Sequence, residues 1–129
     1  MIEVTAAIIR QNDNVLICQR PEGKACELLW EFPGGKIEPG ETGEKCIVRE
    51  CQEELGVTVR VIRKHTDVIY EYTTRTVHLH FYICEIESGE LVRKEHNDFA
   101  WVNIDNIKKY TFCPADTKML LETGITNIF

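Results

Sequence analysis

Two apolar runs near the start of the chain predict two short strands. The segment 2–10 is rich in β-branched residues, and the segment 15–20 begins with a second apolar run. The polar stretch QNDN at 11–14 separates them, and a cluster of this kind is typical of a tight turn. The pattern therefore predicts a β-hairpin.

A helical period replaces the strand pattern between about residues 42 and 55. Thr42 can cap the N-terminus of this helix, and Gly56 can end it. At about 100° per residue, the residues expected on the buried face are Ile47, Val48, Cys51 and Leu55. Prolines and glycines interrupt the preceding segment 21–42, which is expected to be mostly loop up to the cap residue.

The second half of the chain returns to strands. The segment 57–65 alternates as a half-buried strand, and the segments 67–72 and 76–86 flank the turn TTR as a second hairpin. A short strand at 99–104 and a helix at 114–124 follow. The order β-β-loop-α-β-β-β-β-α predicts one domain over residues 1–129, with helices packed on a mixed sheet in an α+β or α/β sandwich.

Composition limits the class of partner. Of the 129 residues, 43% are hydrophobic, which argues against disorder, and the formal net charge is −6. Proteins that bind nucleic-acid polymers need a basic surface, so no such partner is expected. A single phosphorylated small molecule remains possible if a few basic groups or a metal face it.

The six cysteines form no C-x-x-C pair, although their even number could suggest disulfides. We expect reduced thiols in the core and no zinc site built from cysteines. The first residues carry no basic leader, and no apolar stretch approaches the roughly 20 residues that span a bilayer. A cytoplasmic location without a membrane partner is therefore expected.

Three carboxylates, Glu50, Glu53 and Glu54, form a stripe beside the apolar face of the predicted helix. A charged, solvated surface is one explanation, because glutamate is a good helix former. However, like charges at Glu50 and Glu54 cost a few tenths of a kcal/mol, roughly, in an isolated helix. A divalent cation would reverse that effect, and such a stripe is a suitable oxygen-ligand set for Mg²⁺ or Mn²⁺.

The glycine pair before the helix supplies a second half to this site. Gly34 and Gly35 have no Cβ, so their backbone can approach a ligand or metal closely, and the Gly34 carbonyl could serve as a hard ligand. No G-K-[ST] follows, which excludes a P-loop, and the D-x-D-x-D-G spacing of an EF-hand is absent. Loop and helix together predict a metal–phosphate site.

The spacing of these residues resembles the signature of the Nudix family. The matching positions are Gly35, Glu41, Arg49, Glu50, Glu53, Glu54, Gly56 and Val57, with Cys51 where a larger aliphatic residue is usual. The resemblance extends over nearly the whole chain, through AAIIR, QRPEG, LWEFPGGK, VHLHFY and PAD. It is greatest with the MutT-like branch, near the bacterial CTP pyrophosphohydrolases and 8-oxo-dGTP diphosphatases.

This resemblance implies a Nudix fold, an α/β/α sandwich around a mixed β-sheet. It implies hydrolysis of a nucleoside triphosphate to the monophosphate and pyrophosphate with Mg²⁺, or Mn²⁺ in its place. The implied metal ligands are Gly34, Glu50, Glu53, Glu54 and Glu95, of which Glu54 and the Gly34 carbonyl are expected to bind directly. The implied catalytic residues are Glu53, Glu50, Arg49 and Glu95. Arg49 would orient a glutamate, Glu41 would stabilise the turn into the helix, and the general base among Glu50, Glu53 and Glu95 remains open.

On the substrate side, the resemblance implies contacts from Arg20, Phe32, Arg75, His78 and Asp116. Alternatives remain for several of these residues. Phe32, like Trp30, could be a plain core aromatic, His78 and His80 could be structural, and Asp116 could cap the last helix.

The substrate itself stays open between several nucleotides. An ionised Asp116 only accepts hydrogen bonds, which suits an exocyclic amine and favours CTP, dCTP or an oxidised or methylated relative. A protonated Asp116 would also donate and would admit 8-oxo-dGTP. Clearance of damaged nucleotides from the nucleotide pool would be the role. A sugar nucleotide substrate and a non-catalytic nucleotide-binding regulator are the alternatives, and the protein could be a monomer or a homodimer.

Overall fold

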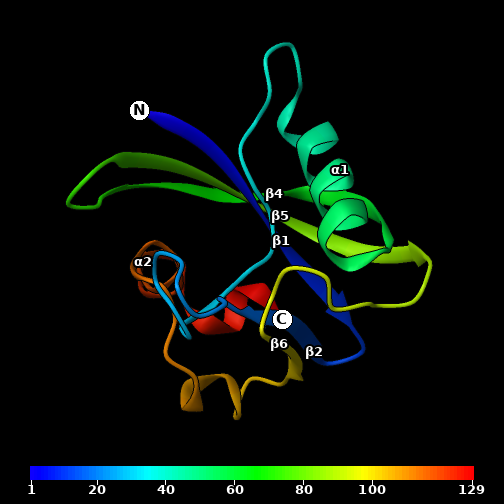
Figure 1. Ribbon diagram of the computed structural model, residues 1–129. Coiled ribbons are helices and arrows are strands. Elements are labelled where there is room, and N and C mark those ends of the chain that lie inside the picture. Colours follow the sequence, from blue (N-terminus) through cyan, green and yellow to red (C-terminus); the bar gives the residue numbers. More distant parts are fainter.

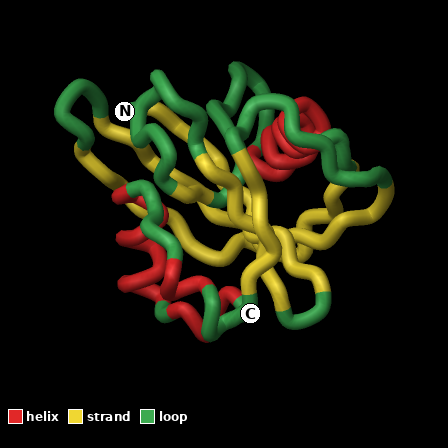
Figure 2. Tube along the Cα trace, turned by 60° about the horizontal axis from the view of Figure 1, so that its bottom comes forward, coloured by secondary structure: helices red, strands yellow, loops and turns green.

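Two helices lie on opposite faces of a mixed β-sheet in the computed structural model, which describes residues 1–129 (Figure 1). The elements in chain order are β1 (Ile2–Gln11), β2 (Asn14–Gln19), β3 (Trp30–Glu31), α1 (Gly43–Leu55), β4 (Thr58–Glu71), β5 (Thr76–Ser88), β6 (Asp98–Val102), the 3₁₀ helix η1 (Ile107–Lys109), α2 (Pro114–Thr123) and the 3₁₀ helix η2 (Ile125–Ile128). Figure 2 shows the same layers after rotation, with the strands between the helical segments. The predicted α/β/α sandwich is confirmed.

β1 is the central strand of the sheet. It runs parallel to β5, from Ile2 opposite Val77 to Ile9 opposite Cys84. β4 and β5 form an antiparallel hairpin, as predicted. β2 pairs antiparallel with β1, β3 and β6, so the sheet order is β3-β2-β1-β5-β4 with β6 beside β2.

The loop that carries the glycine pair fills a gap between β1 and β2. These strands pair only next to their turn, at Arg10–Val15 and Gln11–Asn14, and then diverge. The segment 33–37 occupies the space beside β1: the amides of Thr5 and Ala7 donate to its carbonyls. Hydrogen bonds to the central strand therefore fix the glycine segment, although it belongs to a loop.

The sheet separates two hydrophobic cores. Because successive strand residues point to opposite faces, Ala6 and Ile8 of β1 face α2, whereas Ala7 and Ile9 face α1. All four are almost completely buried. Burial on both faces is the reason that the stretch Ala6–Ile9 of β1 is an unbroken apolar run in the sequence.

The first helix matches its prediction at both ends. The Thr42 hydroxyl accepts a hydrogen bond from the Lys45 amide, and Gly56 ends the helix in the left-handed conformation with φ 72°. The predicted buried face is wrong at Val48, which is 38% exposed. Cys46 is buried in its place, because its thiol contacts Thr5 and the carbonyls of Gly35 and Lys36.

The strand predictions differ from the structure in two places. The segments 57–65 and 67–72 form one strand, β4, whose register shifts near Val61 and Lys64 interrupt the alternation. The short strand β3 lies in a segment expected to be loop, where its two residues bridge β2. The two 3₁₀ helices were not predicted either.

All six cysteines are unpaired, which agrees with the prediction that they form no disulfides. Five of them are buried, but Cys26 is partly exposed, so its assignment to the core was wrong. None of the helices combines the length and the apolar character needed to cross a bilayer.

Candidate active site

Glu50 and Glu54 of α1 face the glycine segment 34–35. Glu54 is only 8% exposed, although it is a carboxylate, and Glu50 is half-buried. The Glu50 carboxyl lies directly against the Gly35 Cα, where a Cβ would overlap it. A Cβ on Gly34 would overlap the Thr5 carbonyl of β1. Because neither glycine has a Cβ, the glycine segment fits tightly between the backbone of β1 on one side and the Glu50 carboxyl on the other.

The Gly34 carbonyl lies on the side of its segment that faces away from β1. The neighbouring carbonyls of Pro33 and Gly35 accept hydrogen bonds from the amides of Ala7 and Thr5 at 2.6 and 2.8 Å. Because carbonyl directions alternate along extended backbone, Gly34 points to the opposite side, and its oxygen accepts no hydrogen bond within the chain. This oxygen is free to bind a cation.

Arg49 connects the helix to the preceding loop. Its guanidinium donates two hydrogen bonds to Glu41, at 2.8 and 3.0 Å, and one to Glu50 at 2.8 Å. It also donates to the Lys36 carbonyl at 3.0 Å and, more weakly, to Glu53 at 3.4 Å. Arg49 therefore fixes the orientation of Glu50, and its bonds to Glu41 lower the pKa of that carboxyl to about 2.

Burial and, after it, crowding by other carboxylates raise the pKa values of Glu54 and Glu50. Burial, followed by the charges of Glu50, Glu31 and Glu95, raises the pKa of Glu54 to about 9. Burial also raises the pKa of Glu50, with contributions from Glu53 and Glu95, although Arg49 opposes this. The Glu54 Oε2 atom is buried and has no hydrogen-bond partner. A divalent cation would relieve both the repulsion and the missing partner.

Glu95 and Glu53 lie at the margins of this cluster. Glu95 lines a cavity of about 520 Å³, together with Glu54, His96 and Arg20. Glu53 is more exposed, with 57% of its side chain accessible, and contacts Arg49. The structure therefore groups Glu50, Glu54 and Glu95 near one another, with Glu53 on the outer side.

A second cavity of about 530 Å³ begins at the glycine segment and extends under the β4–β5 turn. Four of the predicted substrate residues line it: Arg20, Phe32, Arg75 and Asp116. Phe32 lines the cavity and also belongs to the hydrophobic core, since its ring stacks on that of Phe112 at 5.5 Å and the residue is 2% exposed.

Asp116 closes the deep end of this cavity. It is buried, and its carboxyl accepts a hydrogen bond from the Phe32 amide at 3.3 Å. Burial, followed by the charge of Glu31, raises the pKa of Asp116 well above its ordinary value. Asp116 is the third residue of α2, whose N-cap residue is Cys113, so the capping alternative does not apply.

His78 does not belong to this cavity. Val77 and Leu79 line it, so the intervening His78 points to the other face of the sheet, where it contacts Glu3 and Asp67. His80 lies on that face as well. The expectation that His78 contacts substrate is therefore wrong, because strand alternation places it on the α1 side.

Sequence reasoning missed three residues that shape the site. Glu31 accepts from His96 at 3.0 Å and lies 3.6 Å from the Arg20 guanidinium, which lines both cavities. The Tyr72 hydroxyl accepts from the Ala115 amide beside Asp116. The alternation of residues around Trp30 in LLWEF was the one signal that could have pointed to Glu31 as a site residue. Nothing in the sequence indicated that Glu31 contacts His96.

Comparisons with known proteins agree with this geometry. The family model described as the NUDIX domain matches residues 4–122. The CTP pyrophosphohydrolase of Escherichia coli (strain K12) is 38% identical over 120 residues, 93% of this chain and 89% of that protein. The 8-oxo-dGTP diphosphatase of the same strain is 33% identical over 92% of this chain and 93% of that protein. The solution structure of the E. coli ORF135 protein superimposes with a TM-score of 0.79 at 36% identity, covering 93% and 86% of the two chains. The chain therefore belongs to the Nudix family.

Proposed function

We propose that this protein hydrolyses a nucleoside triphosphate to the monophosphate and pyrophosphate, with cytidine nucleotides or their oxidised or methylated relatives as substrates. One observation carries the proposal. The carboxylate cluster around Glu54 and the cavity that ends at Asp116 meet at Gly35, which the Glu50 carboxyl contacts, and at Arg20, which lines both cavities. A triphosphate on the cluster would thus place its base in the cavity.

The cluster fits a hard divalent cation, for which we propose Mg²⁺, or Mn²⁺ in its place. The oxygen donors that would hold it are Gly34, Glu50, Glu53, Glu54 and Glu95. Support comes from the buried Glu54 oxygen without a partner and from the unbonded Gly34 carbonyl. When bound, such a cation neutralises phosphate charge and lowers the pKa of a water molecule.

Side chains of the protein supply the remaining functions. A glutamate near the phosphates, either Glu53, Glu50 or Glu95, removes the proton of the attacking water. Arg49 holds Glu50 in place through its 2.8 Å hydrogen bond. Arg20, at the junction of the two cavities, stabilises negative charge on the departing phosphate.

Asp116 is the proposed base-reading group. Burial, followed by the charge of Glu31, raises its pKa and so favours the protonated carboxyl, which both donates and accepts hydrogen bonds. Cytosine offers a matching exocyclic amine and ring acceptor. The same protonation supports a second candidate, 8-oxo-dGTP, the substrate in the name of the E. coli relative that is 33% identical.

The experiment is an activity screen with Mg²⁺ over CTP, dCTP, 5-methyl-dCTP, dGTP, 8-oxo-dGTP and a UDP-sugar, with pyrophosphate and monophosphate both measured. We expect pyrophosphate from a cytidine nucleotide at the highest kcat/KM. Glu53→Gln, which keeps shape but removes charge, should lower turnover by orders of magnitude without loss of fold. Tight nucleotide binding without any turnover would identify a non-catalytic regulator, and preferential cleavage of the UDP-sugar would overturn the substrate class.

The proposed setting is the cytoplasm, with a free nucleotide as the only partner. The six unpaired thiols suit a reducing compartment, and the net charge of −6 disfavours nucleic-acid polymers. A monomer and a homodimer are both compatible with the site, because all proposed ligands come from one chain.

A further inference from the structure

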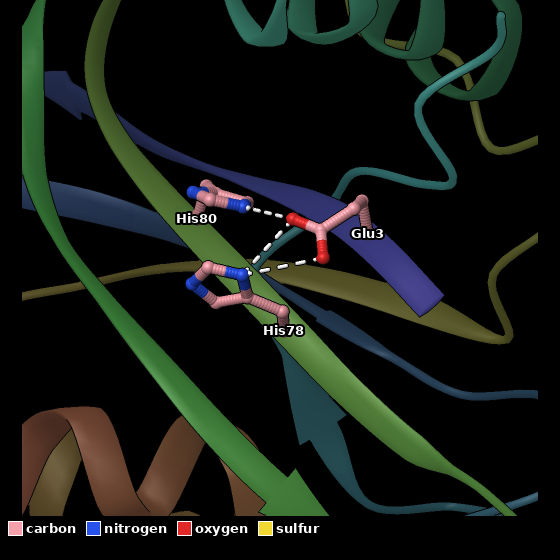
Figure 3. Close-up of side chains that lie close together, drawn as sticks. All are labelled: Glu3, His78 and His80. Atoms are coloured by element: carbon pink, nitrogen blue, oxygen red, sulfur yellow. Dashed lines mark hydrogen bonds and ion pairs between the residues drawn. The ribbon is translucent and has the colours of Figure 1, made fainter. Parts of the chain in front are cut away.

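Three potential metal ligands converge on the sheet face that carries α1, outside the active-site cavities. Glu3 of β1 lies beside His78 and His80 of β5, and its carboxylate contacts both rings (Figure 3). The Glu3 carboxylate is 2.9 Å from His78 Nδ1 and 2.8 Å from His80 Nε2. One ligand atom from each of the three side chains falls within 4.8 Å of the other two.

The parallel register of β1 and β5 brings these residues together. Glu3 is the direct partner of His78, and His80 lies two residues further along β5, so all three side chains project from the same face. The two imidazole rings lie 4.1 Å apart. The His78 and His80 side chains are 21% and 15% exposed, so the rings are held in place yet reachable from solvent.

Neighbouring side chains orient both rings. Asp67 of β4 bonds to His78 Nε2, which leaves His78 Nδ1 directed at Glu3. A carboxylate behind a histidine is the usual outer support of a metal-binding imidazole. Lys64 lies 2.9 Å from His80 Nδ1, on the far side of that ring from Glu3, and its long exposed chain is free to move away.

We propose that Glu3, His78 and His80 form a binding site for a divalent transition metal of the zinc type. Two imidazole nitrogens and one carboxylate oxygen are a ligand set for Zn²⁺, whereas Mg²⁺ prefers oxygen ligands only. Glu3 already presents a carboxylate oxygen to a nitrogen of each ring. Solvent completes the coordination, because Glu3 is exposed on its open side.

Such a metal would join β1 to β5 across their parallel ladder. The charged groups that face the site are Glu3, Asp67 and Lys64. Bound Zn²⁺ would replace the protons that now link Glu3 to the two rings, whereas the bond between Asp67 and His78 Nε2 would be kept. The site is therefore expected to raise thermal stability when zinc is present, independently of nucleotide hydrolysis.

The test is Zn²⁺ binding by isothermal titration calorimetry to the Cys26→Ser protein, in which the partly exposed thiol cannot compete. His80→Gln should weaken binding at this site by about tenfold or more, and Asp67→Asn by about tenfold. Zn²⁺ that also binds at the glutamate cluster is unaffected by either substitution, so the difference between the proteins reports this site alone. His65→Gln is the matched control, because the His65 ring forms its hydrogen bond with Thr123 and lies outside the cluster.

Histidine NMR provides a second measurement on the unmutated rings. Addition of Zn²⁺ should shift the imidazole signals of His78 and His80 and leave that of His65 in place. Glu3→Gln serves as an independent variant if His80→Gln does not fold. Identical Zn²⁺ isotherms for Cys26→Ser with and without Glu3→Gln, or unshifted His78 and His80 signals, would overturn the proposal.

Discussion

Burial of the Glu54 carboxyl beside other carboxylates makes the metal-free protein sensitive to pH. Burial, followed by the charge of Glu50, raises the pKa of Glu54 to about 9 in the folded protein, against an ordinary value of 4.5 for an exposed glutamate. Between these values the unfolded chain has released a proton that the folded protein retains. The free energy of unfolding is therefore highest, as far as this group is concerned, below pH 4.5, and it falls as the pH rises towards 9.

Glu54→Gln should remove this fall in stability with rising pH, because glutamine does not ionise. In urea unfolding of metal-free protein at about pH 8, we expect the variant to be more stable than the wild type by about 1–3 kcal/mol. The difference should shrink as the pH falls below 4.5, where the wild-type carboxyl becomes protonated in both states. Parallel pH profiles for the two proteins would contradict the buried, unpaired carboxylate. The same variant should have lost turnover by orders of magnitude.

Asp116 offers a contrast between two substitutions. Asparagine reproduces the donor and acceptor of a protonated carboxyl, so Asp116→Asn should retain kcat/KM for the best substrate to within about tenfold. Asp116→Ala leaves the base and the Phe32 amide without a partner and should lower that value by about 10–100-fold. Poor substrates should lose less, which changes the substrate ranking. Equal losses on every nucleotide would assign Asp116 a purely structural role.

At the scale of single elements, α1 and its loop depend on one guanidinium. Arg49 bonds to Glu41, Glu50 and the Lys36 carbonyl at the same time. A lysine ammonium lacks the planar fork needed for this geometry. Arg49→Lys should therefore lower kcat by about 10–100-fold while far-UV circular dichroism stays unchanged. Lys45→Ala on the exposed face of α1 is the control, and a wild-type rate for Arg49→Lys would refute the positioning role.

Elements with local signals were predictable from the sequence. Thr42 and Gly56 marked both ends of α1, and the apolar run of β1 marked a buried strand. β3 was missed because its two residues form a strand only through pairing with Cys18 and Gln19 of β2. Two residues are too few to show a strand pattern in the sequence. Likewise, the glutamate stripe was visible along one helix, whereas the Glu31–His96 contact and the position of His78 depend on register between distant segments.

Over the whole molecule, the cysteines report on the integrity of both cores. Cys18, Cys51 and Cys84 lie in the core under α1, and burial raises the pKa of each thiol. Cys46 and Cys113 are also buried, which leaves only Cys26 accessible.

A thiol reagent should therefore modify one cysteine rapidly in the native protein and all six after unfolding without reductant. Cys26→Ser should abolish the rapid phase and leave the slow phases unchanged. Several rapid thiols in the native state would contradict the burial pattern, and fewer than six after unfolding would contradict the absence of disulfides.

The parallel pairing of β1 with β5 has a consequence for folding kinetics. Ile2 must find Val77, and the intervening chain includes α1 and β4, so the central ladder joins residues far apart in sequence. Such long-range pairing slows folding to the range of about milliseconds to seconds. Until β5 docks, the stretch Ala6–Ile9 of β1 is apolar on both of its faces without a full set of neighbours. Refolding yield should consequently fall as protein concentration rises, because two unfinished chains can pair through this strand.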